Sequence, residues 1–362
     1  MKKRKFCHTA LPIFLLTVLS VLLLSNTQAA MDGIRRGLTL CAQTVIPALF
    51  PFLVLSELIV SSGVGETLGR MLGKPLSALL GISQNAASAV LLGVLCGQPI
   101  SSVTALAFLR QKELEEKELQ RISLFANNPS SGFLIGAVGV ALFGNKQAGV
   151  ALFCITTLSA LLVALGLRFF GGKIVQNEKK PPNGARKTLS FSDLTDSVKR
   201  AFRTLLQICA FLLFFCALGN VLGELFAALA FPAVFRVLVF GILEMTCGVS
   251  YAVTALPARA AFRCTAFFCG FAGLSVCMQI FSLTEGHSPP FTAYFLAKLV
   301  QGALNLLLCE IYLRLFDPAL SPATSIPTFF TSRGVGISHY ILCALILLSV
   351  AAYSVKKREK GT

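Results

Sequence analysis

The sequence predicts an all-α membrane protein with about eight to ten hydrophobic segments, in two inverted-repeat halves with broken or re-entrant helices. Three observations lead to this prediction. The mean hydropathy is +0.76, and 55% of the residues are hydrophobic while only 13% are charged, where a soluble domain carries about 25% charge. Several apolar runs reach the roughly 20 residues that span a bilayer. Some of these runs are interrupted by polar, helix-breaking sequence.

Residues 1–30 form the first element. Met1–Lys5 is basic, and the apolar run Phe6–Leu24 ends near Thr27-Gln28-Ala29-Ala30. This pattern fits a secretory signal with an A-x-A-like cleavage site, and it fits a first membrane helix equally well. We favour an uncleaved anchor, because the chain that follows is itself predicted to be embedded.

Residues 35–170 form the first predicted repeat. Its apolar segments are Cys41–Ser62, Ala86–Leu109, Ile122–Phe143 and Ala148–Phe170. The second is interrupted by Gly97-Gln98-Pro99-Ile100-Ser101-Ser102, and the third opens with Phe125-Ala126-Asn127-Asn128-Pro129-Ser130-Ser131-Gly132. An unpaired backbone group in lipid costs several kcal/mol, so a broken helix at membrane depth needs protein or a water-filled cavity around it. Solute sites of secondary transporters are built from such discontinuous helices.

Residues 171–203 form a linker with eight basic and three acidic residues. The linker is expected on the cytoplasmic side, because Lys and Arg collect in cytoplasmic loops. At its end Ser190 and Asp193 have the spacing of a capping box. Apolar residues then recur at helical spacing, which predicts a short helix lying on the membrane face. They are Phe191, Leu194, Val198 and Phe202.

Residues 204–316 form the second predicted repeat, and residues 317–362 a loop, a last membrane helix (Val335–Val355) and a basic tail. The segments of the repeat are Leu205–Leu229, Ala233–Ala255, Ala261–Leu283 and Thr292–Phe316. Breaks at Glu244-Met245-Thr246-Cys247-Gly248 and Gly270-Phe271-Ala272-Gly273-Leu274-Ser275 match those of the first repeat in position. If one broken segment in each half is re-entrant, the linker and both termini are cytoplasmic and the repeats are inverted. Arg35 and Arg36 would then face outside, against the same charge bias.

Two glutamates are candidates for function, because ionisable groups inside a span are costly to insert. Glu57 and Glu244 lie in apolar segments of different halves. Each is suited to take up a proton or a cation, or to bind a polar solute. The alternative is a carboxylate that reaches the interface or is tied to a neighbouring helix.

The polar side chains at the breaks complete the predicted substrate-binding set. Their amide and hydroxyl groups both donate and accept, which suits a neutral polar ligand. The alternative is that they hold helices together. The full set is Glu57, Gln98, Ser101, Asn127, Asn128, Ser130, Glu244, Thr246, Ser275 and Gln279.

Several other functions are disfavoured. The net charge of +16 is spread over the N-terminus, the linker and the C-terminus, as for topology determinants beside anionic lipid, so nucleic-acid binding is not expected. The 12 cysteines are scattered without a C-x-x-C pair, so no metal site is predicted. No cofactor motif or catalytic signature is present, so the chain is not expected to be an enzyme.

Four motifs resemble one family. The run Ile46-Pro47-Ala48-Leu49-Phe50-Pro51-Phe52 followed by Leu55-Ser56-Glu57-Leu58 is similar to a motif of YlbJ-type sporulation integral membrane proteins, within the wider Gate, or nucleoside-recognition, domain proteins. The other three are Phe125-Ala126-Asn127-Asn128-Pro129, Gly241-Ile242-Leu243-Glu244-Met245-Thr246 and Gly270-Phe271-Ala272-Gly273-Leu274-Ser275-Val276. The resemblance covers about residues 35–315. It implies a spore-forming bacterium, a multi-pass protein of the cell membrane and a domain shared with nucleoside transporters, and it brings no substrate with it.

Two hypotheses follow. The first is a transporter-like sporulation protein that binds or moves a small polar solute, nucleoside-like in one version, at a midplane site between the repeats. Its partners would be the lipid bilayer, the solute and a coupling ion, with a homo-oligomer as a further option. The second is a non-transporting membrane scaffold for spore-envelope (cortex or coat) assembly, in which the basic linker is the working part.

Overall fold

The computed structural model describes residues 17, 19–62, 75–171, 190–316 and 318–320. Every regular element within these ranges is a helix, which confirms the predicted all-α class. By length and composition, four helical stretches are suited to cross a membrane, and shorter apolar helices accompany them. The four are Lys146–Phe169, Phe191–Ala228, Ala258–Leu283 and Phe291–Phe316.

All four interruptions predicted from the sequence are breaks between helices. The flanking pairs are α5 (Gln84–Cys96) and α6 (Ile100–Arg110), α7 (Glu116–Ser123) and the π-helical η2 (Gly132–Leu142), α10 (Ala233–Leu243) and α11 (Met245–Ala255), and α12 (Ala258–Phe271) and α13 (Gly273–Leu283). We call them breaks 1 to 4 in chain order. Gly97 in break 1 has φ +88° and Ala272 in break 4 has φ +69°, and a left-handed residue cannot continue a right-handed helix.

Within each half, the two breaks contact each other. The backbone N–H of Gln98 in break 1 donates to the carbonyl oxygen of Asn128 in break 2 at 2.7 Å. In the second half, a Cβ placed on Gly273 would lie 3.2 Å from the backbone nitrogen of Met245. The close backbone approach explains why glycine stands at this position. The inverted relation between the halves stays a prediction.

Helix α9 (Phe191–Ala228) is longer than the sequence suggested. Its N-terminus has the predicted capping box, in which the backbone N–H of Ser190 donates to Asp193 Oδ2 at 2.9 Å. The segment expected to lie on the membrane face and the span expected after residue 203 are one continuous helix of 38 residues. No glycine or proline lies near that boundary to end the helix.

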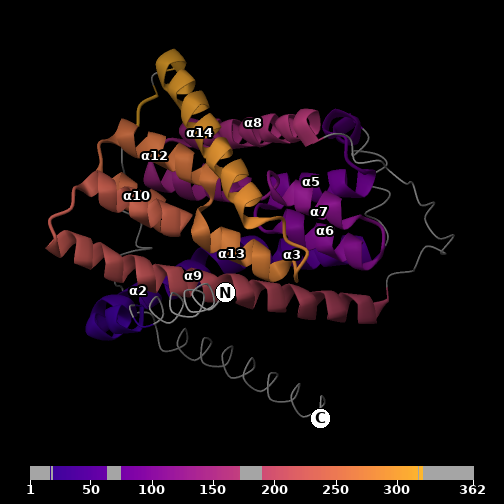
Figure 1. Cartoon of the computed structure of the whole chain (residues 1–362), viewed down its shortest axis with the longest axis horizontal. Coiled ribbons are helices and arrows are strands. Elements are labelled where there is room, and N and C mark those ends of the chain that lie inside the picture. The colour runs from indigo at the N-terminus through magenta and orange to yellow at the C-terminus, as the bar shows by residue number, and fades with distance from the viewer. Residues whose placement is uncertain (1–16, 18, 63–74, 172–189, 317, 321–362) are drawn as a thin grey trace, which may run out of the picture. The chain divides into compact units, whose positions relative to one another are not determined.

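Figure 1 shows α9 running along one side of the described helices, with α2 (Thr27–Leu40) beside it. The π-helical η1 (Cys41–Val45) and α3 (Ile46–Ser61) also pack on α9. Pro51 lies inside α3. On the other side, α14 (Phe291–Phe316) packs across α12 and α8 (Lys146–Gly171). Most of the predicted anchor, residues 172–189 of the linker and the segment Val335–Val355 lie outside the described residues.

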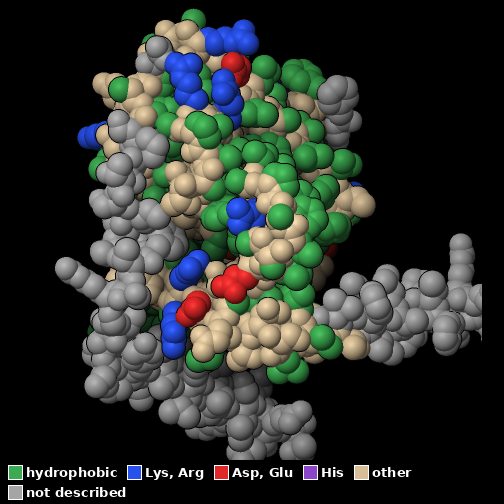
Figure 2. Space-filling model, turned by 90° about the vertical axis from the view of Figure 1, so that its left-hand side faces the viewer, with side chains coloured by type: hydrophobic (Ala, Val, Ile, Leu, Met, Phe, Trp, Pro, Cys, Tyr) green, Lys and Arg blue, Asp and Glu red, His purple; other side chains and the backbone are tan. Residues whose placement is uncertain are grey.

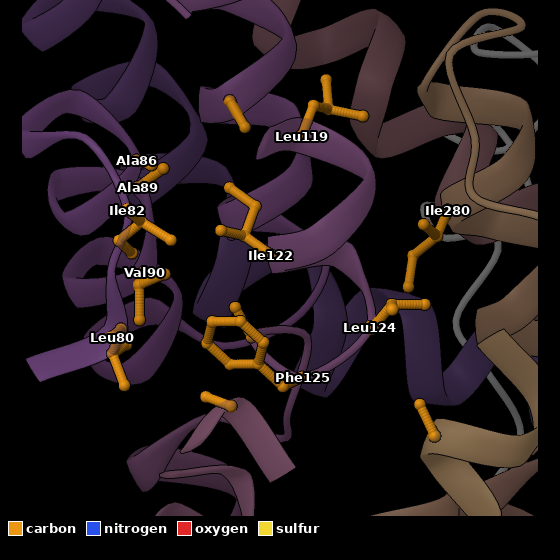
Figure 3. Packing of buried hydrophobic residues seen from close by; sticks show 14 of the residues in the cluster. Leu80, Ile82, Ala86, Ala89, Val90, Leu119, Ile122, Leu124, Phe125 and Ile280 are labelled. Atoms are coloured by element: carbon orange, nitrogen blue, oxygen red, sulfur yellow. The ribbon is translucent and has the colours of Figure 1, made fainter. Parts of the chain in front are cut away.

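One hydrophobic cluster joins the two halves. Figure 3 shows Ile122 and Phe125 of the α7 region between Val90 of α5 and Ile280 of α13. Ala272 of break 4 belongs to the same cluster. The second half therefore packs directly on the segment that contains break 2.

Many large apolar side chains are exposed on the described surface, as a lipid-facing protein requires. Figure 2 shows them over much of one face, with charged side chains gathered near the top and below the middle. On α14 alone, seven such side chains are between 40% and 58% exposed: Phe291, Leu296, Leu299, Val300, Leu306, Leu307 and Ile311. The helices that carry them are thus suited to a bilayer.

Candidate functional site

The candidate site is built around Asn127 and Asn128 in break 2. Asn127 Nδ2 donates to Ser102 Oγ at 2.8 Å and to the Ser123 carbonyl oxygen at 3.1 Å. Asn128 Nδ2 donates to the Phe125 carbonyl oxygen at 2.8 Å. Both side chains are buried, so these bonds satisfy carbonyl groups that the break leaves without helical partners.

Lys298 of α14 reaches into break 2 and is only 1% exposed. Its ammonium donates to the Asn127 carbonyl oxygen at 2.6 Å, to Gln301 Oε1 at 2.9 Å and to Asn128 Oδ1 at 3.3 Å. Gln301 Nε2 closes the network by donating to Asn128 Oδ1 at 2.7 Å. The buried side-chain nitrogen of Lys298 is thus held by three oxygens at a helix break.

Sequence reasoning missed Lys298. The signal was available, because a lysine inside the apolar segment Thr292–Phe316 meets the same criterion that selected the two glutamates. Gln301 and Asn305 continue the polar stripe of Lys298 along α14, at the spacing of one helix face.

Asn305 ties three helices together. Its Nδ2 donates to Thr156 Oγ1 at 3.2 Å and to the Ala266 carbonyl oxygen at 2.8 Å. Its Oδ1 accepts from Ser159 Oγ. The polar stripe of α14 therefore contacts α8 and α12 as well as break 2.

Three buried oxygens at breaks 1 and 2 have no hydrogen-bond partner in the described part of the chain. They are Gln98 Oε1, Ser101 Oγ and Asn127 Oδ1. Buried polar groups in native proteins are nearly always satisfied, so three such atoms on two contacting breaks indicate a place for a donor from outside the protein. Ser130 differs from them, because its Oγ accepts from the Phe133 N–H at 3.2 Å.

Glu57 lies outside this group. Its Oε2 pairs with Arg200 Nε of α9 at 2.6 Å, which matches the alternative of a carboxylate tied to a neighbouring helix. Glu310 is also paired, with Arg263 at 2.8 Å and Arg314 at 3.2 Å. A surface groove lies over Arg263 and Glu310, and it contains no residue of the predicted set.

Glu244 forms break 3. Its Oε2 accepts from the Cys247 N–H at 2.6 Å, which caps α11. Thr246, the next predicted residue, is half-buried. On α13, Gln279 Nε2 donates to Ser275 Oγ at 3.2 Å. In the described ranges, no hydrogen bond joins these second-half residues to the Asn127–Lys298 network, so the structure brings together the first-half candidates.

Comparison with known proteins gives one informative similarity. The chain is 24% identical over 323 residues to the sporulation integral membrane protein YlbJ of Bacillus subtilis (strain 168). The alignment covers 78% of this chain and 78% of that protein. No family model matches the chain. No solved structure matches it either.

Proposed function

Starting from a YlbJ-type integral membrane protein, as the motifs and the similarity show, we propose that this chain acts in sporulation by binding a small polar solute inside the bilayer. The site is the contact between breaks 1 and 2, walled by Lys298 of α14. Solute binding there is the first step of transport or of sensing. In this proposal the protein is transporter-like, and an ion is the partner to which solute movement is coupled.

The observation that carries the proposal is the set of three buried oxygens without partners. Gln98 Oε1, Ser101 Oγ and Asn127 Oδ1 come from breaks that touch through the Gln98–Asn128 backbone bond. All three accept hydrogen bonds, and Ser101 also donates. A ligand rich in N–H and O–H groups, such as a nucleoside, has the complementary chemistry.

The membrane setting also favours a solute site at these breaks. Water is excluded from the hydrocarbon region, so irregular backbone at that depth is found where it lines a cavity or is buried in protein. Discontinuous helices in transporters expose such groups to a solute. The same logic applies to breaks 1 and 2, whose polar atoms exceed what the described protein groups satisfy.

Ser101→Ala is the variant that tests this function. It deletes an oxygen that bonds no described protein group, so it should leave the stability of the unliganded protein unchanged. We expect a thermal-shift screen of nucleosides and small polar metabolites to find a ligand. A ligand at a concentration of 100 times its dissociation constant adds about 2.7 kcal/mol to the free energy of unfolding. Ser101→Ala should lower the affinity for that ligand at least about tenfold.

The matched control is Ser88→Ala on the neighbouring helix α5. Ser88 is buried too, but its Oγ donates to the Gln84 carbonyl oxygen at 3.0 Å within its own helix. Ligand affinity should survive this change. Equal affinity of wild type and Ser101→Ala would place the ligand elsewhere and end the proposal, and uptake into proteoliposomes then separates transport from binding alone.

A scaffold function is the second candidate, and one observation favours it. On the first turns of α9, Phe191 is 83% exposed and Leu194 is 41% exposed, beside a basic linker. Such a surface suits anionic lipid or a partner in spore-envelope assembly. Replacing Phe191 and Leu194 with Ser should block sporulation if this surface is the working part, and a normal spore yield would remove the scaffold hypothesis.

A further inference from the structure

A second cluster of reactive side chains lies where α9 passes break 3. Cys216 comes from α9, Glu244 is the break itself and Cys247 lies in the first turn of α11. The two sulfur atoms are 3.3 Å apart. One ligand atom from each of the three residues lies within 4.8 Å of the others.

These three side chains match the preferences of a thiophilic cation. Zn²⁺ binds cysteine sulfur at about 2.3 Å, which puts two sulfurs of a tetrahedral site about 3.8 Å apart. The observed pair needs to open by only about half an ångström to reach that spacing. Mg²⁺ and Ca²⁺ prefer sites made of oxygen alone, so this donor set selects against them.

The electrostatic setting also calls for a cation. Glu244 is 3% exposed, and no Lys, Arg or His of the described ranges forms an ion pair with it. Its described hydrogen bonds, from the Cys247 N–H at 2.6 Å and from Thr246, orient the carboxylate without supplying a full charge. Buried carboxylates are usually paired or bound to metal.

The surroundings resemble the shell of a metal site. Leu40, Cys41 and Leu212 form one buried cluster with Cys216, and Cys247 packs against it. An apolar shell of this kind keeps water away and strengthens the bonds between ligand and metal. Cys216 and Glu244 are buried, whereas Cys247 is half-buried.

We propose that Cys216, Glu244 and Cys247 bind one thiophilic divalent cation, with Zn²⁺ as the reference ion, and that the ion ties α9 to break 3. On binding, the two thiols release their protons to solvent, and two thiolates and one carboxylate donate lone pairs to the ion. No electron is transferred. No sequence motif indicates this site, because the cysteines are 31 residues apart and outside any C-x-x-C pattern.

Cobalt titration of the reduced, full-length protein in detergent tests the site. Co²⁺ in a thiolate site gives a thiolate-to-metal charge-transfer absorption, which Zn²⁺ then displaces. We expect one equivalent per chain. Cys216→Ser and Cys247→Ser should each abolish the absorption, and Glu244→Gln should weaken Co²⁺ binding at least about tenfold. Cys154→Ser is the matched control, because Cys154 is an exposed cysteine of α8 outside the cluster.

A second measurement avoids variants that fail to fold. In wild-type protein, Zn²⁺ should protect the half-buried Cys247 from maleimide alkylation and leave the exposed Cys154 reactive, as read by mass spectrometry. The proposal is overturned if the reduced protein gives no charge-transfer absorption, if the absorption survives both Cys→Ser changes, or if oxidants link the two cysteines in protein that takes up no metal. Loss of solute binding with the cobalt absorption intact would refute the proposed function alone.

Discussion

Lys298 donates a 2.6 Å hydrogen bond to the backbone carbonyl of Asn127, 171 residues away in the chain. The bond joins α14 to the non-helical segment between α7 and η2. The ammonium has three donors, and the three oxygens of Asn127, Asn128 and Gln301 use all of them. Within the described ranges no carboxylate pairs with it, so the geometry of break 2 depends on this lysine.

Lys298→Met should therefore loosen break 2. The change removes the donor from the Asn127 carbonyl, and an unsatisfied buried acceptor costs about 1–3 kcal/mol. We expect amide hydrogen exchange in a peptide covering residues 124–131 to speed up at least about tenfold, as mass spectrometry will show. Lys199→Met is the control, since Lys199 is exposed and pairs only with Asp196 at 3.3 Å among the described residues. Unchanged exchange in Lys298→Met would show that the break holds its shape without the ammonium.

Gly97→Ala should disturb the contact between breaks 1 and 2. Gly97 has φ +88°, and a Cβ there would lie 2.7 Å from the backbone nitrogen of Ser130. Gly286 is a matched control, with φ +89° and no atom within 4 Å of its Cβ position. Both variants place an alanine at positive φ, which costs about 1–3 kcal/mol, but only Gly97→Ala adds an overpacking cost of about 1–3 kcal/mol.

The measurement for this pair is thermal unfolding together with affinity for the ligand found in the screen. Gly97→Ala should unfold at a lower temperature than Gly286→Ala and should lose ligand binding. Equal effects of the two changes would mean that backbone strain alone matters and that the contact with Ser130 can relax.

The helix breaks could be predicted because their causes are local. Pro99 has no N–H to continue a helix, and Asn127-Asn128-Pro129 combines a helix breaker with side chains that bond nearby backbone. The all-α class could also be predicted from local sequence, because long apolar runs indicate membrane helices. Helix α9 runs through residues 203–204, where two separate segments were predicted from the sequence, because a change in polarity does not end a helix.

The long-range partners could not be predicted. Glu57 stood out as a charge in an apolar segment, but its partner Arg200 lies 143 residues away, in what the sequence presented as a linker. Cys216 and Cys247 approach each other only because α9 passes break 3. Such contacts depend on how helices pack, and the sequence periodicity of one helix carries no information about which residue of another helix it meets.

Gly270→Ala should weaken the packing of α12 on α14. A Cβ at this position would lie 2.8 Å from Asn305 Nδ2 and 2.8 Å from the Gln301 carbonyl oxygen, so Asn305 must give up its bond to Ala266. We expect a lowered melting temperature and a loss of about 1–3 kcal/mol. Gly166→Ala in α8 meets no atom within 4 Å and should be neutral or stabilising by up to about 1 kcal/mol, because alanine favours a helix over glycine. A reversed order of the two variants in thermal unfolding would contradict the described packing.

Glu57 belongs either to the solute site or to the packing contact between α3 and α9. Its carboxylate is buried, and it forms a 2.6 Å ion pair with the half-exposed guanidinium of Arg200. We expect a double-mutant cycle of Glu57→Gln and Arg200→Gln to give a coupling energy of about 1 kcal/mol, at the upper end for a partly exposed pair. Ligand affinity should stay at the wild-type value in all three variants, because neither side chain bonds the Asn127–Lys298 network. If Glu57→Gln abolishes ligand binding while the coupling energy is zero, the glutamate contacts the solute and the site must extend to α3.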